Sequence, residues 1–159
     1  MTEQTTIAPV RRSVTVAATP AEAFATFTTR MAAWWPLATH HLGEEPPIDV
    51  VVEPIAGGRW YERAAGGAER EWGRVLAYEP PGRILLAWHL DGTFAYDPDA
   101  ERAADVEVTF AAVAGGTRVT LEHRGFERQN EGLRAAHAVA QEGGWSGILE
   151  GLVQLAGAA

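Results

Sequence analysis

The sequence of 159 residues contains no cysteine and no lysine. Without cysteine the chain has neither disulfides, nor thiolate chemistry, nor a cysteine-based zinc site. Without lysine it cannot form a Schiff base with a carbonyl substrate. All 13 basic residues are therefore arginines, and they are scattered along a chain whose net charge is −8. This charge pattern excludes a basic stripe, so we do not expect nucleic acid as a partner.

Long apolar runs are also absent. No stretch approaches the roughly 20 apolar residues that a membrane span requires, and Met1–Thr6 lacks the basic and apolar regions of a signal peptide. We therefore expect a cytoplasmic protein without a membrane partner. The length predicts one domain, over residues 8–157, large enough to bury about 70% of its unfolded surface without crosslinks.

The chain contains short segments in which apolar and polar residues alternate, separated by turns rich in glycine and proline. Alternation of apolar and polar residues predicts strands over residues 10–17, 48–53, 59–63, 69–78, 83–90, 105–112 and 117–124. Gly115 and Gly116 predict a hairpin between the last two. No helical pattern separates the strands from residue 48 onward, which indicates an antiparallel sheet.

Two short helices are expected directly after the first strand. Thr19 is a suitable N-cap, followed by Pro20 at the first helical position and Glu22 three residues after the cap. A second short helix carries Trp34 and Trp35 and ends before a proline. The next residues, 37–47, form a polar loop.

The C-terminal segment predicts a long helix from about Glu142 onward. Its apolar residues recur at helical spacing on an arc of roughly 120°: Trp145, Ile148, Leu149, Leu152, Leu155 and Ala156. Gly144, Gly147 and Gly151 form a second stripe beside this arc. Each interior glycine costs about 1 kcal/mol relative to alanine, so the helix needs packing against the sheet. Close contact with a strand is the expected reason for the stripe, with a partner or a bound molecule as alternatives.

This order of elements is that of an α+β helix-grip fold, in which a curved antiparallel sheet wraps around a long C-terminal helix. Within that order stand several motifs: Thr19–Phe24, Trp34–Pro36, Gly57–Trp60, Trp72–Leu76, Glu79–Pro81 with Arg83 and Trp88, Gly116–Val119, His123 and Gly144–Trp145. In these motifs the chain resembles the START-like (SRPBCC) superfamily and, within it, proteins similar to the activator of the heat-shock-protein-ninety ATPase, from Val14 to about Leu155. The resemblance implies a hydrophobic cavity between helix and sheet. It does not fix an activity, because relatives bind lipids, hormones or polyketides, some cyclise polyketides, and a eukaryotic branch stimulates a chaperone ATPase.

Six tryptophans from well-separated segments are the main candidates for lining such a cavity. Each indole combines a large apolar surface with one N–H donor that needs a partner when buried. Strand alternation and the helical arc then give the expected cavity residues: Trp34, Trp35, Trp60, Glu62, Trp88, Phe110, His123, Trp145, Leu149 and Leu152. Trp34 and Trp35 either form a lid, or one packs inward while the other lies on the surface.

Glu62 and His123 are the polar members of this set. If Trp60 faces inward, Glu62 does too, and a carboxylate in an apolar site needs a partner or a raised pKa. A pair between Glu62 and His123 would make a general acid–base unit. The alternative is that His123 bonds to strand-end groups while Glu62 pairs with a surface arginine.

Other polar residues give weaker indications. His40 and His41 with Glu44 and Glu45 lack a third spaced ligand, a pattern typical of a solvated loop, so no metal or other cofactor is expected. His89 alternates to the face opposite Trp88 and is expected to meet solvent.

The leading expectation is a protein that binds an apolar small molecule without catalysis. A protein-interaction module that contacts a chaperone or another protein is the first alternative, and it would have a filled interior and an exposed patch. An enzyme of the cyclase or hydrolase type using Glu62 and His123 is the second. A second copy of the chain also remains open as a partner.

Overall fold

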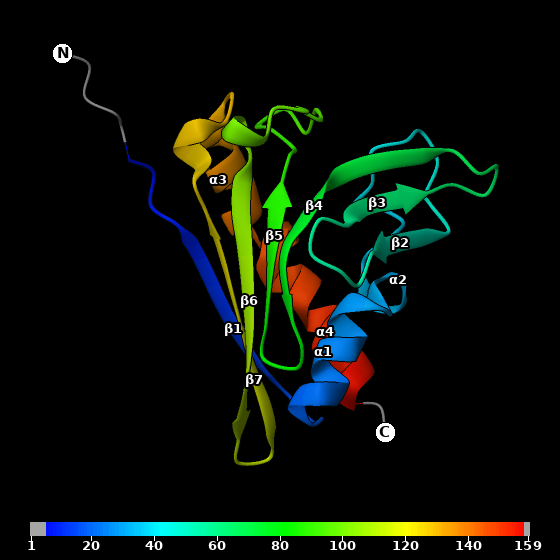
Figure 1. The fold of residues 1–159 in the computed structure, drawn as a ribbon, viewed down its shortest axis with the longest axis vertical. Helices are drawn as coiled ribbons and strands as arrows, with labels where there is room; N and C mark the ends of the chain where they lie inside the picture. The colour runs from blue at the N-terminus through cyan, green and yellow to red at the C-terminus, as the bar shows by residue number, and fades with distance from the viewer. Residues whose placement is uncertain (1–5, 158–159) are drawn as a thin grey trace.

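The computed structural model of the protein describes residues 6–157, which form one seven-stranded antiparallel sheet and four α-helices. The strands are β1 (Val10–Val16), β2 (Asp49–Val52), β3 (Arg59–Arg63), β4 (Glu69–Glu79), β5 (Arg83–Trp88), β6 (Ala104–Val113) and β7 (Gly116–Arg124). The helices are α1 (Pro20–Thr28), α2 (Met31–Trp34), α3 (Gly132–Ala140) and α4 (Gly147–Gly157). The strand order is β1-β7-β6-β5-β4-β3-β2 (Figure 1).

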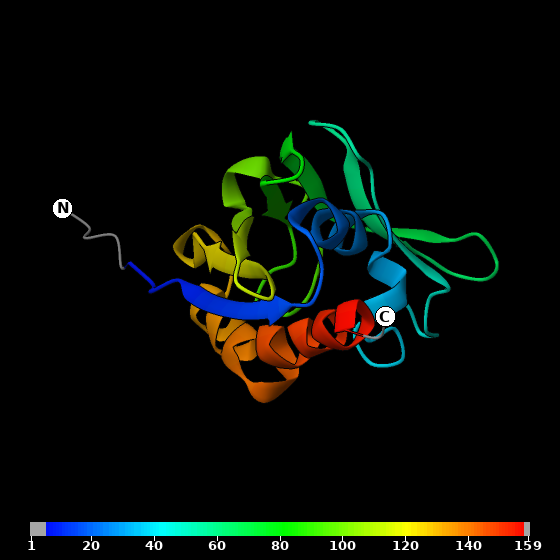
Figure 2. The ribbon, with the colours of Figure 1, turned by 90° about the horizontal axis from the view of Figure 1, so that it is seen from below.

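The sheet is strongly curved, and the helices lie on its open side. In Figure 2 the sheet curls from β1 round to the hairpins of β2, β3 and β4, while α4 runs alongside β1 and beside α1 and α2. This is a helix-grip-like α+β arrangement, and the predicted fold class is confirmed. Within residues 6–157 no helix is long and apolar enough to cross a membrane.

The first helix begins as the sequence predicts. The Thr19 hydroxyl accepts a hydrogen bond from the Glu22 N–H at 3.2 Å, and Pro20 occupies the first helical position. The second helix is a single turn, and Pro36 follows it closely. Both helices place aromatic side chains, Phe24, Phe27 and Trp34, in the core.

Strand alternation also predicts the inward faces of β6 and β7 correctly. In β6 Val106, Val108 and Phe110 are buried, and in β7 Val119, Leu121 and His123 are buried. His123 lies between Val106 on one neighbouring strand and Val10 on the other. The predicted inward direction of Glu62 in β3 is likewise confirmed, because its side chain is only 3% exposed.

The predicted C-terminal helix is present, but it begins at Gly147 rather than at about Glu142, and a further helix that was not predicted, α3, precedes it. Gly144 has non-helical angles (φ −89°, ψ −142°) inside a π-helical turn, Glu142–Ser146, that separates α3 from α4. A Cβ on Gly144 would overlap the carbonyl group of Val139, so the sharp change of direction requires glycine here. Trp145, Ile148, Leu149 and Leu152 are buried as predicted.

The glycine stripe has a different cause from the expected strand contact. A Cβ on Gly151 would overlap the carbonyl oxygen of Trp34 in α2, so this glycine permits close approach of two helices. A Cβ on Gly147 would meet the carbonyl oxygen of Glu142 in the preceding turn. The glycines therefore allow α4 to pack closely against α2 and against the turn that precedes it.

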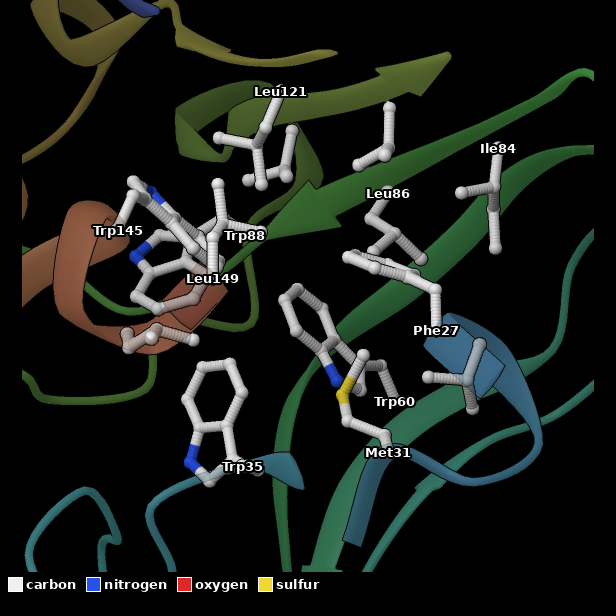
Figure 3. Packing of buried hydrophobic residues seen from close by; sticks show 14 of the residues in the cluster. Phe27, Met31, Trp35, Trp60, Ile84, Leu86, Trp88, Leu121, Trp145 and Leu149 are labelled. Carbon is white, nitrogen blue, oxygen red and sulfur yellow. The ribbon is translucent and has the colours of Figure 1, made fainter. Parts of the chain in front are cut away.

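Five indoles form a closed circuit of contacts at the centre of the core. Consecutive ring centroids are 4.8 Å apart for Trp35 and Trp72, 5.5 Å for Trp72 and Trp60, 5.5 Å for Trp60 and Trp88, 5.7 Å for Trp88 and Trp145, and 6.0 Å for Trp145 and Trp35. Figure 3 shows Trp35, Trp60, Trp88 and Trp145 turned toward one another beside Leu149. Each tilted or edge-to-face pair contributes about 0.5–1.5 kcal/mol beyond burial of area. The tryptophans therefore fill much of the interior themselves.

Candidate functional site

A cavity of about 340 Å³ opens on one side of the indole circuit. Trp35, Trp72, Trp88 and Trp145 form its aromatic wall, and Leu90 and Phe94 extend that wall beyond β5. Loop 37–47 contributes residues 39–42, and the junction of α3 and α4 contributes residues 138–139, 143–144 and 148. The cavity therefore lies between this loop, the end of β5 and the helix junction.

Three of the ten residues predicted to line a cavity do so: Trp35, Trp88 and Trp145. The other seven are buried in the packed core: Trp34, Trp60, Glu62, Phe110, His123, Leu149 and Leu152. Phe110, for example, packs against Phe24 and Phe27 of α1. Because Trp34 and Trp35 are 5% and 6% exposed, the interpretation that leaves one of them on the surface is wrong.

Sequence reasoning missed Trp72 and loop 37–47 as parts of the cavity wall. Trp72 alternates in β4 like any strand residue, and its position opposite Trp35 depends on contacts between distant segments. The loop has a polar composition typical of solvent-exposed segments. Its two adjacent histidines were its only signal, and they line the cavity without forming a metal site. Among residues 6–157 no cluster of three or more metal-ligating side chains occurs.

Hydrogen bonds join His40 of the cavity lining to the helix junction and to the aromatic wall. Its Nε2 lies 2.6 Å from the carbonyl oxygen of Gly143 in the helix junction. A carbonyl only accepts, so Nε2 carries a proton and donates it. Nδ1 lies 2.7 Å from the Thr39 hydroxyl, and the His40 carbonyl accepts from the Trp35 indole at 2.9 Å. The loop is thus joined to both the helix junction and the aromatic wall.

Glu62 anchors the same loop from behind the wall. One carboxylate oxygen accepts from the Leu42 N–H at 2.6 Å and from the Trp72 indole at 2.8 Å. The other lies 3.4 Å from the Gly43 N–H. These donors are the partners that a buried carboxylate requires. Glu62 therefore positions both a wall residue and the loop that faces it.

His123 lies behind the wall, fully buried among aromatic rings. Its Nδ1 accepts from the Trp145 indole at 3.0 Å, and its ring packs 4.4 Å from the ring of Phe126. Burial lowers the pKa of His123 from 6.5 to about 3, because the charged imidazolium would lose its hydration there. The neutral ring then carries its proton on Nε2, which has no partner among residues 6–157.

The predicted pair between Glu62 and His123 is not formed. Glu62 accepts from Trp72 and from loop amides, and His123 accepts from Trp145. The alternative for Glu62, a surface arginine, is also wrong for the same reason. The two groups act as separate supports for neighbouring indoles, and neither lines the cavity.

His89 also differs from the expectation that it meets solvent. It is 3% exposed, its Nδ1 lies 2.8 Å from the Asp97 carbonyl oxygen, and its ring stacks on Tyr96 at 5.5 Å. The segment after β5 folds back over this face, which strand alternation alone does not predict.

Two residues of the wall, His41 and Trp88, each have one polar atom that makes no hydrogen bond within residues 6–157. His41 lies in the cavity wall with Nδ1 2.7 Å from the carbonyl oxygen of Gly43, while no bond to its Nε2 is formed within residues 6–157. Trp88 is the one indole of the wall whose N–H makes no hydrogen bond within the same residues; the other three donate to His40, Glu62 and His123. Each of these two wall residues thus keeps one polar atom, an acceptor in His41 and a donor in Trp88, without a hydrogen bond within the described residues.

A family model described as "Activator of Hsp90 ATPase homolog 1-like protein" matches residues 17–157 of the chain. No curated protein matches the chain significantly. Many solved structures are similar to it.

These structures include two that are more than 30% identical to the chain. An anthrahydroquino-γ-pyrone synthase, Txn09, complexed with SUM, is 35% identical, with a TM-score of 0.65 over 94% of this chain and 97% of that one. CalC from Micromonospora echinospora, described as a self-sacrificing resistance protein, is 32% identical, with a TM-score of 0.67 over 92% of both chains. The Aha1 dimer from Colwellia psychrerythraea is 14% identical with a TM-score of 0.66 over 95% of this chain and 97% of that one, which shows a shared fold.

Proposed function

This chain belongs to the Activator of Hsp90 ATPase homolog 1-like family, and on that premise we propose that it binds a flat, largely aromatic small molecule in the cavity beside the indole circuit. The observation that carries the proposal is the wall itself. Four indoles, from Trp35, Trp72, Trp88 and Trp145, form the aromatic wall of a space of about 340 Å³. Ligand pockets span about 300–1,000 Å³, so the space suits a compact ligand.

The chemistry of the wall favours an aromatic ligand over a flexible chain. Indole faces and edges make offset-stacked and edge-to-face contacts with other rings, worth about 0.5–1.5 kcal/mol per pair beyond burial. A rigid ring system also loses little conformational freedom on binding, whereas an acyl chain loses several rotors. The few polar atoms of the wall then fix the orientation of the ligand.

One relative above 30% identity supports this choice of ligand. It is named as a synthase of an anthrahydroquino-γ-pyrone, a fused aromatic product, and was solved complexed with SUM. The family description, in contrast, points to stimulation of a chaperone ATPase. The indole-walled cavity supports ligand binding more directly, because an interaction module would not need one.

Titration of the intrinsic tryptophan fluorescence with flat aromatic probes tests the proposal. We suggest 1,2-dihydroxyanthraquinone, a naphthoquinone and a flavone, with a saturated fatty acid as the non-aromatic comparison. Ala138→Phe fills the cavity from its half-buried rim, while Ala140→Phe adds the same ring two residues along, on an exposed position outside the cavity. Neither change removes a core side chain, so both variants should fold.

Saturable quenching by an aromatic probe, weakened at least about tenfold by Ala138→Phe and unchanged by Ala140→Phe, is the expected result. No quenching by any probe, together with stimulation of a chaperone ATPase, would reject the proposal in favour of protein interaction. Chemical conversion of a bound probe, followed by mass spectrometry, would reassign the cavity to catalysis.

A further inference from the structure

The His41 ring has a defined proton position in the cavity wall. Its Nδ1 lies 2.7 Å from the carbonyl oxygen of Gly43, which can only accept, so Nδ1 holds the proton. The second nitrogen of a neutral imidazole then carries a lone pair. His41 lines the cavity and its Nδ1 is bonded to the loop backbone, so Nε2 is the ring nitrogen left for a hydrogen bond to a ligand.

No other imidazole nitrogen of the wall is available in this way. Both nitrogens of His40 are engaged, one by the Gly143 carbonyl and one by the Thr39 hydroxyl. His41 Nε2 is therefore the basic nitrogen of the cavity that lacks a partner within residues 6–157. A flat ligand that covers it without donating a hydrogen bond would remove water from it and leave it unpaired, at a cost of about 1–3 kcal/mol.

The chemistry of Nε2 restricts which ligands avoid that cost. A phenolic or enolic hydroxyl is a strong donor and is carried by a flat ring, so it satisfies Nε2 while the ring contacts the indoles. An ionised carboxylate only accepts and would leave Nε2 unpaired. The Trp88 indole N–H, unpartnered within the described residues, is a donor that a ring carbonyl of the same ligand can satisfy.

We infer that His41 is the specificity-determining residue of this cavity and that it selects planar aromatic ligands with an acidic hydroxyl group, phenolic or enolic, by accepting the hydroxyl proton in a hydrogen bond to Nε2. This inference rests on the proposed function. It names the class of ligand within that function: hydroxyquinones, hydroxypyrones and related hydroxylated ring systems.

The experiment compares two anthraquinones with the same ring system, one with hydroxyl and one with methoxy substituents. 1,2-Dihydroxyanthraquinone can donate from its hydroxyl groups, and 1,2-dimethoxyanthraquinone cannot. The measured quantity is the ratio of their Kd values, obtained from tryptophan quenching. Using a ratio cancels any loss of stacking that a substitution causes for both probes alike.

Two substitutions of His41 separate its two nitrogens. His41→Asn keeps an N–H near the Nδ1 position, which can still donate to Gly43, and removes Nε2. His41→Gln places an oxygen acceptor near the Nε2 position and should restore the preference in part. His137→Asn is the matched control, because His137 is exposed on α3 and lies outside the cavity wall.

In the wild-type protein and in His137→Asn we expect the dihydroxy probe to bind about tenfold more tightly than the dimethoxy probe, with the ratio falling to near one in His41→Asn. An unchanged ratio in His41→Asn, or equal binding of both probes by the wild type, would overturn the inference while leaving the proposed function intact. Absence of quenching by either probe would overturn both.

Discussion

His123 illustrates how a single buried residue ties stability to pH. Its pKa falls from 6.5 to about 3 because burial removes hydration from the imidazolium. The unfolded chain therefore binds a proton on His123 more readily than the folded chain between these two values. The free energy of unfolding is therefore unaffected by the titration of His123 above pH 6.5. As the pH falls from 6.5 toward 3, protonation of His123 in the unfolded chain lowers it by about 1.4 kcal/mol per pH unit.

A substitution of His123 should remove this part of the pH dependence. His123→Asn keeps an acceptor for the Trp145 N–H but does not titrate. Between pH 7 and pH 5 we expect the free energy of unfolding of the wild type to fall by about 2 kcal/mol more than that of the variant. Urea unfolding at both pH values measures it, with the exposed His137→Asn as the control. Equal losses in wild type and His123→Asn would contradict the burial argument.

For single residues, the sequence predicts which way a side chain points better than it predicts its hydrogen-bond partner. Alternation along β3 and β7 placed Glu62 and His123 on the inward face, and both are buried. Their partners come from elsewhere: Leu42 from a loop 20 residues away in sequence and Trp145 from the helix junction, 22 residues away. No local pattern encodes such contacts, because they depend on how whole elements approach one another.

In helix α4 a tertiary contact matters more than helix propensity at one position. Gly151 lies inside a helix, where alanine would be favoured by about 1 kcal/mol. A Cβ at this position would overlap the Trp34 carbonyl oxygen of α2, and backbone cannot move aside as a flexible side chain can. The overlap should outweigh the propensity, since crowding of a packed core costs about 1–3 kcal/mol.

We therefore expect Gly151→Ala to destabilise the protein by about 1–2 kcal/mol. Gly66→Ala is a suitable comparison, because a Cβ there meets nothing within 4 Å; it should be neutral or slightly stabilising. Thermal or urea unfolding of both variants distinguishes the two effects. A stabilised Gly151→Ala protein would mean that helix propensity decides at this position.

The remaining elements were predictable where their pattern is periodic. The seven strands, the Thr19 cap and the buried arc of α4 follow from alternation, capping chemistry and helical spacing. The break at Gly144 and the separate helix α3 did not, because an alanine-rich stretch with two glycines has no distinctive period. That break shapes one side of the cavity, so the site was harder to predict than the fold.

For the whole molecule, the position of the cavity at one end of the core has a measurable effect. Ligand binding should protect backbone amides of loop 37–47 and of residues 138–148, which border the cavity. The hairpin of β2 and β3 contributes no residue to the cavity wall, so its amides should be protected less than those of the loop. Hydrogen exchange with and without 1,2-dihydroxyanthraquinone tests this, with Ala138→Phe as the control. Protection confined to β2 and β3 would place binding elsewhere.

The closed circuit of five indoles also has a photophysical consequence. Ring centroids separated by 4.8–6.0 Å are close enough for excitation energy to migrate between chromophores before emission. The five rings would then share their excitation, including Trp60, which does not border the cavity. A quenching molecule bound against one ring should therefore quench the fluorescence of all five.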